Sequence, residues 1–347
     1  MLIVTSDEAK ARKMCDDASF FNKEAIYYPA KDAIFYSADV HGNQITGERL
    51  RCISRIINHS STGEGVLTVV TTMDGIADRL IPVERFKEAV ITLDYSSEIE
   101  PEKLAKKLVA MGFVRTGMVE DKGQFAIRGG IIDIFSYTDE APVRIELWDT
   151  EVDSIRMFDV ESQRSIERLQ SYSIFPATEY IFTEDELKNG LYNIKEECDR
   201  QLECFDYGKR KRTKEQIEAG NNLNKLVADV ERTGNYEKFT DTLVADTVGL
   251  AEYFPEENTL VVLDEPNRLK ECNELTLYEY NESMKNRLAA GYVLPSQTNK
   301  VKAMNEIISD LRNNKKLILT TLDYKPEGFE IDYSMYITAR SISSYNN

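Results

Sequence analysis

The sequence predicts an α/β protein in which a lobe built on a parallel sheet is interrupted by a smaller α+β insert. Strands and helices alternate over residues 1–96, strands follow one another over residues 97–178, and residues 179–347 begin with long helices before strands return. Alternation of strands and helices is typical of a parallel sheet, whereas consecutive strands joined by short turns are typical of an antiparallel one. We therefore expect three parts with these bounds.

The first part contains short apolar runs that alternate with amphipathic segments. The run Val66–Thr71 is continuous and rich in β-branched residues, which is typical of a strand buried on both faces. Leu50, Ile53 and Ile57 recur at helical spacing. The expected strands are 2–5, 25–28, 66–71 and 89–93, and the expected helices are 8–17, 46–58 and 74–80.

The insert is dominated by strands. The turn Asp149–Glu151 joins two alternating runs, which predicts a β-hairpin. Gly123, Gly129 and Gly130 permit bends or bulges. The expected elements are a helix over 101–111 and strands over about 113–119, 124–135, 143–149, 152–159 and 169–175.

The last part begins with two long, charged, amphipathic helices. Apolar residues such as Leu223, Leu226 and Val230 line one face of the second helix. The expected helices are 183–205, 212–233, 268–290 and 299–313, and the expected strands are 260–263 and 316–321.

Charge limits the classes of partner. The chain carries 43 Lys and Arg against 60 Asp and Glu, a net charge of −17, and a field of that sign repels DNA and anionic membranes. The basic run Lys209–Arg212 leaves a weak local DNA contact as an alternative to a solvated loop. No apolar run approaches the roughly 20 residues of a membrane helix. We expect a soluble cytoplasmic protein without a membrane partner.

Few residue types that carry out catalysis are present in a suitable pattern. The two histidines, His41 and His59, are too few for a multi-histidine metal centre, and the serines beside His59 are sequence neighbours rather than parts of a triad. The five cysteines form no C-x-x-C pair. We therefore expect no catalytic residue and no metal site, and reduced thiols that serve mainly in packing.

One acidic pair raises the question of nucleotide binding. Asp264 and Glu265 end an apolar strand, at the place where enzymes with a phosphate-binding loop hold their metal ion. The sequence contains no G-x-x-x-x-G-K-[ST] loop. The pair is therefore interpreted as a cap of the following helix. A residual nucleotide-dependent, DNA-remodelling enzyme that uses Asp264 and Glu265 stays open as the alternative function.

The segment Val143–Trp148 is the part of the insert that is most informative about function. Strand alternation places Arg144, Glu146 and Trp148 on one face and the apolar residues between them on the other. A row of this make-up, with the chain's single tryptophan, is typical of an interaction hot spot. A solvated ion pair beside a half-buried tryptophan is the alternative. Arg128, on another expected strand, would extend the row.

The runs Gly123–Phe135 and Arg144–Arg156 resemble the insert domain of the bacterial transcription-repair coupling factor (Mfd) family. The resemblance covers essentially the whole chain. It implies the N-terminal UvrB-like module: domain 1a over 1–96, domain 2 over 97–178 and domain 1b over 179–347. It also implies that domains 1a and 1b form a degenerate, helicase-like version of the phosphate-binding-loop fold, and that the chain is a fragment clipped at both ends.

The resemblance further implies a function. In this family domain 2 binds UvrA and so brings nucleotide excision repair to a stalled RNA polymerase. By motif position, the UvrA-facing residues are Arg128, Arg144, Glu146, Trp148 and, less closely, Arg156. The aromatic position is more often Phe in the family, so Trp148 is a departure. The resemblance implies no cofactor here, since ATP and Mg²⁺ serve the motor domains, and RNA polymerase and double-stranded DNA are partners of the longer protein.

Overall fold

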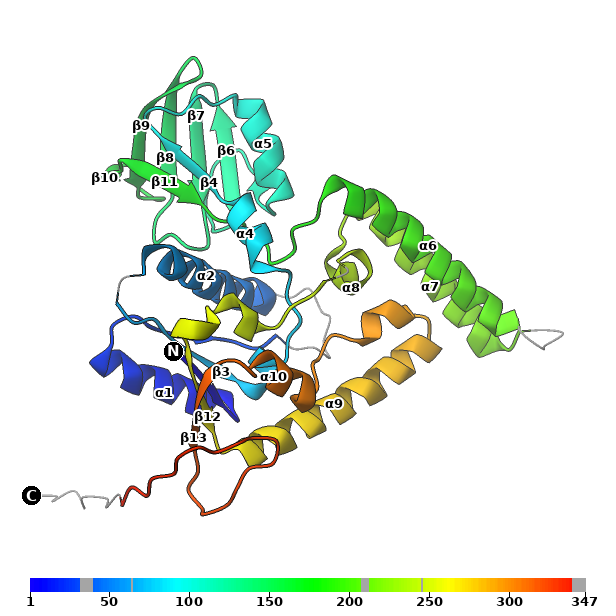
Figure 1. Ribbon diagram of the computed structural model, residues 1–347. Helices are drawn as coiled ribbons and strands as arrows, with labels where there is room; N and C mark the ends of the chain where they lie inside the picture. Colours follow the sequence, from blue (N-terminus) through cyan, green and yellow to red (C-terminus); the bar gives the residue numbers. More distant parts are fainter. Residues whose placement is uncertain (32–39, 64, 207–211, 245, 339–347) are drawn as a thin grey trace, which may run out of the picture.

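The computed structural model describes the chain except for residues 32–39, 64, 207–211, 245 and 339–347 (Figure 1). Lys209, Arg210 and Lys211 of the basic run therefore lie outside the described residues. The described chain forms a parallel sheet with helices on both faces, a mainly antiparallel sheet above it and a projecting helical hairpin (Figure 1). The α/β class expected from the sequence is confirmed; the three domain bounds stay predictions.

The parallel sheet draws its strands from both ends of the chain. Its five strands, in spatial order, are β13 (Lys315–Leu319), β12 (Leu260–Asp264), β1 (Leu2–Thr5), β3 (Thr68–Thr72) and β2 (Ala25–Tyr28). β1 lies between β3 and β12, with Leu2 in register with both Val69 and Val261. The last part of the sequence therefore completes the sheet that the first part begins, on either side of the insert.

Helices cover both faces of this sheet because the central strands are apolar on both sides. Leu2 and Val4 face one core with residues of α2 and α9, whereas Ile3 packs against α1 with Ala11 and Cys15. The side chain of Asp7 accepts a hydrogen bond from the backbone of Lys10 and so begins α1. The helices are α1 (Glu8–Phe21), α2 (Val40–Thr62), α3 (Met73–Ile76), α4 (Val83–Ala89), α9 (Pro266–Ala289) and α10 (Met304–Asp310).

The insert is built on a six-stranded sheet. Its strands, in spatial order, are β10 (Ser165–Arg168), β9 (Glu151–Phe158), β8 (Val143–Trp148), β7 (Ile131–Phe135), β6 (Gln124–Arg128) and β5 (Val114–Arg115). All neighbouring strands are antiparallel except β5 and β6. Helix α5 (Pro101–Ala110) and a two-stranded sheet of β4 (Ile91–Asp94) and β11 (Ser171–Ile174) pack on its apolar face (Figure 1).

The structure corrects several details of the sequence prediction. The strand expected over 124–135 is two strands, because Gly129 adopts a φ of 61° and the chain reverses there. A side chain at Gly130 would meet the carbonyl oxygen of Leu147 at 2.9 Å, so a glycine is needed at this turn. Helix α4 and strand β10 were missed, and the strand expected at 89–93 begins only at Ile91.

The last part contributes the helical hairpin and several short helices. α6 (Glu184–Asp206) and α7 (Lys214–Thr233) pack along an apolar seam that includes Ile194 and Leu223, and Figure 1 shows the pair projecting from the lobe. Thr213 and Gln216 form a capping box that begins α7. The short elements are η1 (Glu237–Phe239), α8 (Thr240–Leu243), η2 (Leu250–Tyr253), η3 (Glu256–Asn258) and η4 (Pro295–Thr298).

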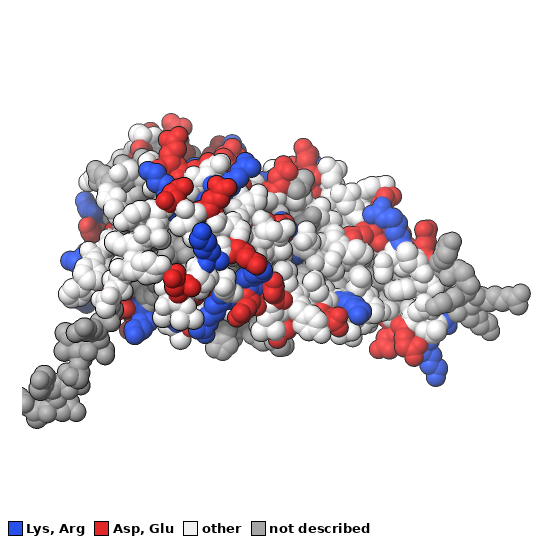
Figure 2. Space-filling view, turned by 60° about the horizontal axis from the view of Figure 1, so that its bottom comes forward, with Lys and Arg blue, Asp and Glu red and all other residues white. Residues whose placement is uncertain are grey.

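Charge is mixed rather than segregated on the face shown in Figure 2, where Lys and Arg side chains lie among Asp and Glu side chains. Within the described part of the chain, no helix combines the length and the apolar character needed to cross a membrane.

Candidate interaction surface of the inserted sheet

The six-stranded sheet has one apolar and one polar face. Alternate residues of β7 and β8, such as Ile132 and Ile145, pack in the core beneath α5. The intervening residues stand on the other face, where Asp133 is in register with Arg144 and Arg144 with Arg156. We call this surface the polar face; it comprises Arg128, Asp133, Arg144, Glu146, Trp148, Ser154, Arg156 and the adjoining Gln163.

Asp133 is at the centre of the polar face and is almost fully buried, with 1% of its surface exposed. Its Oδ1 accepts a hydrogen bond from Nε of Arg144 at 2.6 Å, and its Oδ2 accepts one from Nη2 of Arg144 at 2.9 Å. The same Oδ2 accepts a hydrogen bond from Nη2 of Arg128. One buried carboxylate therefore organises two arginines from the strands on either side of it.

Arg144 is held on several sides at once. Its Nη2 also donates to Oε1 of Gln163 at 2.8 Å, and its guanidinium stacks over the ring of Phe158, 4.3 Å from the centroid. Its hydrogen bond to Asp133 raises the pKa of the guanidinium above its ordinary value. Only 12% of this side chain is exposed. The sequence predicts Arg144 as a residue of an interaction surface; its burial against Asp133 shows that it also supports the fold.

A second ion pair lies beside the first. Glu146 accepts hydrogen bonds from Nη2 of Arg156 and, at 2.7 Å, from the hydroxyl of Ser154. Arg144 and Arg156 are directly opposite each other on neighbouring strands, a placement that is unfavourable for like charges. Each has its own carboxylate, which offsets the repulsion. Both Glu146 and Arg156 stay partly accessible, with 29% and 26% of their side chains exposed.

Trp148 ends strand β8 at the hairpin turn. Asp149 takes a left-handed φ of 57° there, and Trp148 pairs with Glu151 across the turn. The hairpin predicted from the sequence is confirmed. Trp148 is 79% exposed, so the alternative of a half-buried tryptophan is wrong. An indole this exposed makes few contacts within the chain and offers a large apolar surface to a partner.

Sequence reasoning missed Asp133 and Gln163 as members of this network. Asp133 did leave a signal, because it is an acidic residue in the middle of the apolar run Ile131–Phe135. A charged residue so placed requires a countercharge if its strand is buried. Gln163 left none, since it reaches Arg144 from the loop after β9.

The acidic pair at the end of β12 is engaged within the chain. Asp264 is 8% exposed, accepts a hydrogen bond from Thr5 at 2.8 Å and forms an ion pair with Lys10. Glu265 adopts a left-handed φ of 56° and accepts a hydrogen bond from the backbone of Thr321 at 2.6 Å. The hydrogen bonds from Thr321 lower the pKa of Glu265. Both carboxylates are thus hydrogen-bonded within the chain. Glu265 is the N-cap residue of α9, but its side chain accepts no hydrogen bond from the first turn, so the interpretation of the pair as a cap of this helix is wrong.

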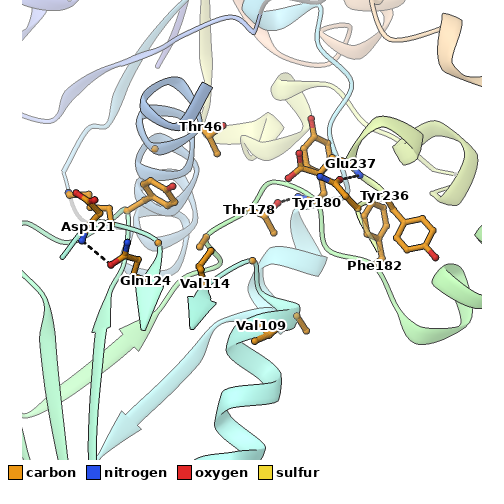
Figure 3. Close-up of a pocket in the computed structure, with 18 of the residues that line it drawn as sticks. Thr46, Val109, Val114, Asp121, Gln124, Thr178, Tyr180, Phe182, Tyr236 and Glu237 are labelled. Atoms are coloured by element: carbon orange, nitrogen blue, oxygen red, sulfur yellow. Dashed lines mark hydrogen bonds between the residues drawn. The ribbon is translucent and has the colours of Figure 1, made fainter. Parts of the chain in front are cut away.

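A cleft of about 1490 Å³ separates the insert from the lobe and the helical hairpin. It is lined by Thr46 of α2, Gln124 of the insert, and Tyr180 and Tyr236 (Figure 3). Its lining mixes aromatic, amide and charged groups without a pattern that indicates one chemistry. Among the residues that the structure describes, no group of three or more His, Cys, Asp or Glu is placed to hold a metal ion.

Comparison with known proteins places the polar face within a recognised segment. Residues 91–180 match the family model described as the UvrB interaction domain. The chain is 34% identical over 305 residues to the transcription-repair-coupling factor of Bacillus subtilis (strain 168), covering 85% of this chain and 24% of the relative. It is 30% identical over 293 residues to the transcription-repair-coupling factor of Staphylococcus haemolyticus (strain JCSC1435), covering 84% of this chain and 24% of the relative.

The chain thus spans about a quarter of the length of these relatives. Every residue of the polar face falls within the segment that matches the domain model. The resemblance expected from the sequence is confirmed: this chain is similar along most of its length to transcription-repair-coupling factors, and it carries a segment that matches the UvrB interaction domain.

Proposed function

We propose that this chain is a non-catalytic module of transcription-repair coupling, which recruits UvrA to stalled RNA polymerase through the polar face. The observation that carries the proposal is Trp148: it is 79% exposed beside two ordered Arg–carboxylate clusters, in a segment that matches the UvrB interaction domain. Exposed tryptophan and arginine are the residues that most often dominate the energy of a protein interface.

The ordering of the polar face supports this use. Arg128 and Arg156 are held by carboxylates before any partner arrives. Side chains that are already fixed lose less conformational entropy on binding, so more of the contact energy appears as affinity. Arg128, Arg144 and Arg156 also outnumber the carboxylates of Asp133 and Glu146, in a chain whose net charge is −17. This local excess of positive charge favours contact with an acidic surface of UvrA.

The other functions of the longer relatives are proposed to lie outside this chain. We assign ATP and Mg²⁺ binding, and the contacts with RNA polymerase and double-stranded DNA, to the part of such proteins that this chain does not span. The module itself is proposed to need no cofactor and to act in the cytoplasm. The engagement of Asp264 with Lys10 and of Glu265 with Thr321 supports a non-catalytic role.

Titration calorimetry of purified UvrA with this chain tests the proposal. We expect saturable binding, and a loss on the order of tenfold or more in affinity for Trp148→Ala. Tyr278→Ala is the matched control, because Tyr278 is an aromatic residue that is 68% exposed on α9. If the chain does not bind a UvrA preparation that binds UvrB, the proposal is wrong. Equal affinities of the Trp148 variant and the parent would place the site elsewhere.

A further inference from the structure

Asp133 connects a side chain that is buried with one that reaches the surface. Its carboxylate is 1% exposed and accepts hydrogen bonds from both Arg144 and Arg128. Arg144 is 12% exposed, whereas Arg128 is 43% exposed. The carboxylate itself cannot reach a partner, yet it touches the most exposed arginine of the polar face.

Arg144 and Arg128 contact the carboxylate of Asp133 in different ways. Arg144 gives Asp133 two N–H donors, stacks on Phe158 and donates to Gln163, so it neutralises the buried carboxylate and anchors it. Arg128 contributes one donor, Nη2, to the same carboxylate. A guanidinium has five N–H donors in a rigid fork, and Asp133 accepts from only one nitrogen of Arg128. Because 43% of this side chain is exposed, the other donors remain for a carboxylate or carbonyl of a partner.

The hydrogen bond to Asp133 also restricts the flexible side chain of Arg128. An arginine side chain that is free in solvent loses considerable rotamer freedom when a partner binds it. The hydrogen bond to Asp133 restricts Arg128 in the free protein, so part of that loss has already occurred before binding.

We propose that Asp133 is a positioning residue of the polar face: without touching the partner, it holds the guanidinium of Arg128 in the orientation that binds an acceptor group of UvrA. This inference rests on the proposed function. Arg128 is the contact residue in this arrangement, and Arg144 anchors the carboxylate that holds it.

A double-mutant cycle on UvrA affinity tests the inference. The chain and its variants Arg128→Ala, Asp133→Asn and Arg128→Ala/Asp133→Asn are titrated into UvrA. Each single substitution is expected to weaken binding on the order of tenfold, and the double variant is expected to bind as Arg128→Ala does. Losses that multiply in the double variant, or an unchanged affinity of Asp133→Asn, would overturn it, since a merely structural Asp133 acts whether Arg128 is present or not.

A second set of variants separates the effect on binding from an effect on folding. It is needed because Asp133→Asn leaves Arg144 without its countercharge. Replacing the pair together, as Asp133→Leu/Arg144→Met, removes both buried charges, a change that folded proteins often tolerate. Adding Arg128→Ala to this background is expected to cause no further loss of affinity. A further loss as large as in the parent chain would contradict the inference.

The cycle separates this inference from the proposed function. If Trp148→Ala weakens UvrA binding and Arg128→Ala does not, UvrA recruitment stands and the role of Asp133 is wrong. If the parent chain does not bind UvrA that is competent toward UvrB, the proposed function fails and the inference fails with it.

Discussion

Arg49 and Glu179 form a buried ion pair although 130 positions separate them in the chain. Nε of Arg49 lies 2.9 Å from Oε1 of Glu179, and Nη2 lies 3.0 Å from Oε2. The same guanidinium donates to Asp78 and to the carbonyl oxygen of Pro29, and it stacks over Tyr28. Because Glu179 follows the last strand of the insert, this pair ties the exit of the insert to helix α2 of the lobe.

Removal of the charge of Glu179 is expected to destabilise the chain. Arg49 is 1% exposed, so Glu179→Gln leaves a buried guanidinium with Asp78 as its remaining carboxylate. Breaking a buried pair typically costs about 3–5 kcal/mol in the free energy of unfolding. Urea denaturation measures this loss. Glu184→Gln is the control, because the exposed pair of Glu184 and Lys188 should contribute less than about 1 kcal/mol; similar losses in both variants would refute the argument.

The ion pair of Arg49 and Glu179 also predicts that the free energy of unfolding depends on pH. Burial alone would raise the pKa of Glu179, but the charges of Arg49 and Lys31 outweigh it, so the pKa lies below its ordinary value of 4.5. A carboxyl group whose pKa is depressed by folding contributes stability above the pKa of the unfolded state and loses it as the pH falls through the folded value.

Stability should therefore fall as the pH drops below 4.5, and Glu179→Gln should flatten this part of the profile. Asp78 acts in the opposite sense, since burial raises its pKa, so the comparison is made between the parent and the Glu179 variant. Parallel profiles of unfolding free energy against pH would contradict the prediction.

Two glycines next to α7 differ in how closely they approach other residues, so their alanine variants test how tightly the helical hairpin packs. Gly291, after α9, has a φ of 74°, and a Cβ there would lie 2.1 Å from the carbonyl oxygen of Ala219 in α7. Gly234, the C-cap of α7, has a φ of 64°, but a Cβ would meet nothing within 4 Å. Gly234→Ala should lower the free energy of unfolding by about 1–2 kcal/mol, because alanine disfavours the left-handed conformation. Gly291→Ala should cost clearly more, as a larger fall in melting temperature; equal falls would show that the helices adjust freely.

Much of the fold could be predicted from the sequence because its signals are local. The apolar strands, the two long helices and the turn at Asp149 depend on residues close together in the chain, and the structure confirms them. Alternation along one strand also placed Arg144 and Glu146 on a shared face. The role of Asp133 depends on the register of three strands, which no local pattern contains. The burial of Arg144 could not be anticipated for the same reason.

Arg144 and Trp148 should therefore behave differently when each is replaced by alanine. Arg144→Ala removes both N–H donors that Arg144 gives to the buried Asp133, and it is expected to lower the free energy of unfolding by about 2 kcal/mol or more. Trp148→Ala should change it by less than about 0.5 kcal/mol, because the indole is 79% exposed. Chemical denaturation of both variants measures the difference. A Trp148 variant as unstable as the Arg144 variant would mean that the indole packs within the chain.

Nucleotide is expected to leave the chain's melting temperature unchanged. The side chain of Asp7 already accepts from the backbone at the start of α1, Lys10 pairs with Asp264, and Thr321 donates to Glu265, so the groups that would meet a phosphate or a metal ion are engaged. A ligand present at 100 times its dissociation constant stabilises the native state by about 2.7 kcal/mol, which a thermal scan detects readily. A rise in melting temperature with ATP and Mg²⁺ that Asp264→Asn abolishes would instead support the residual nucleotide-dependent enzyme.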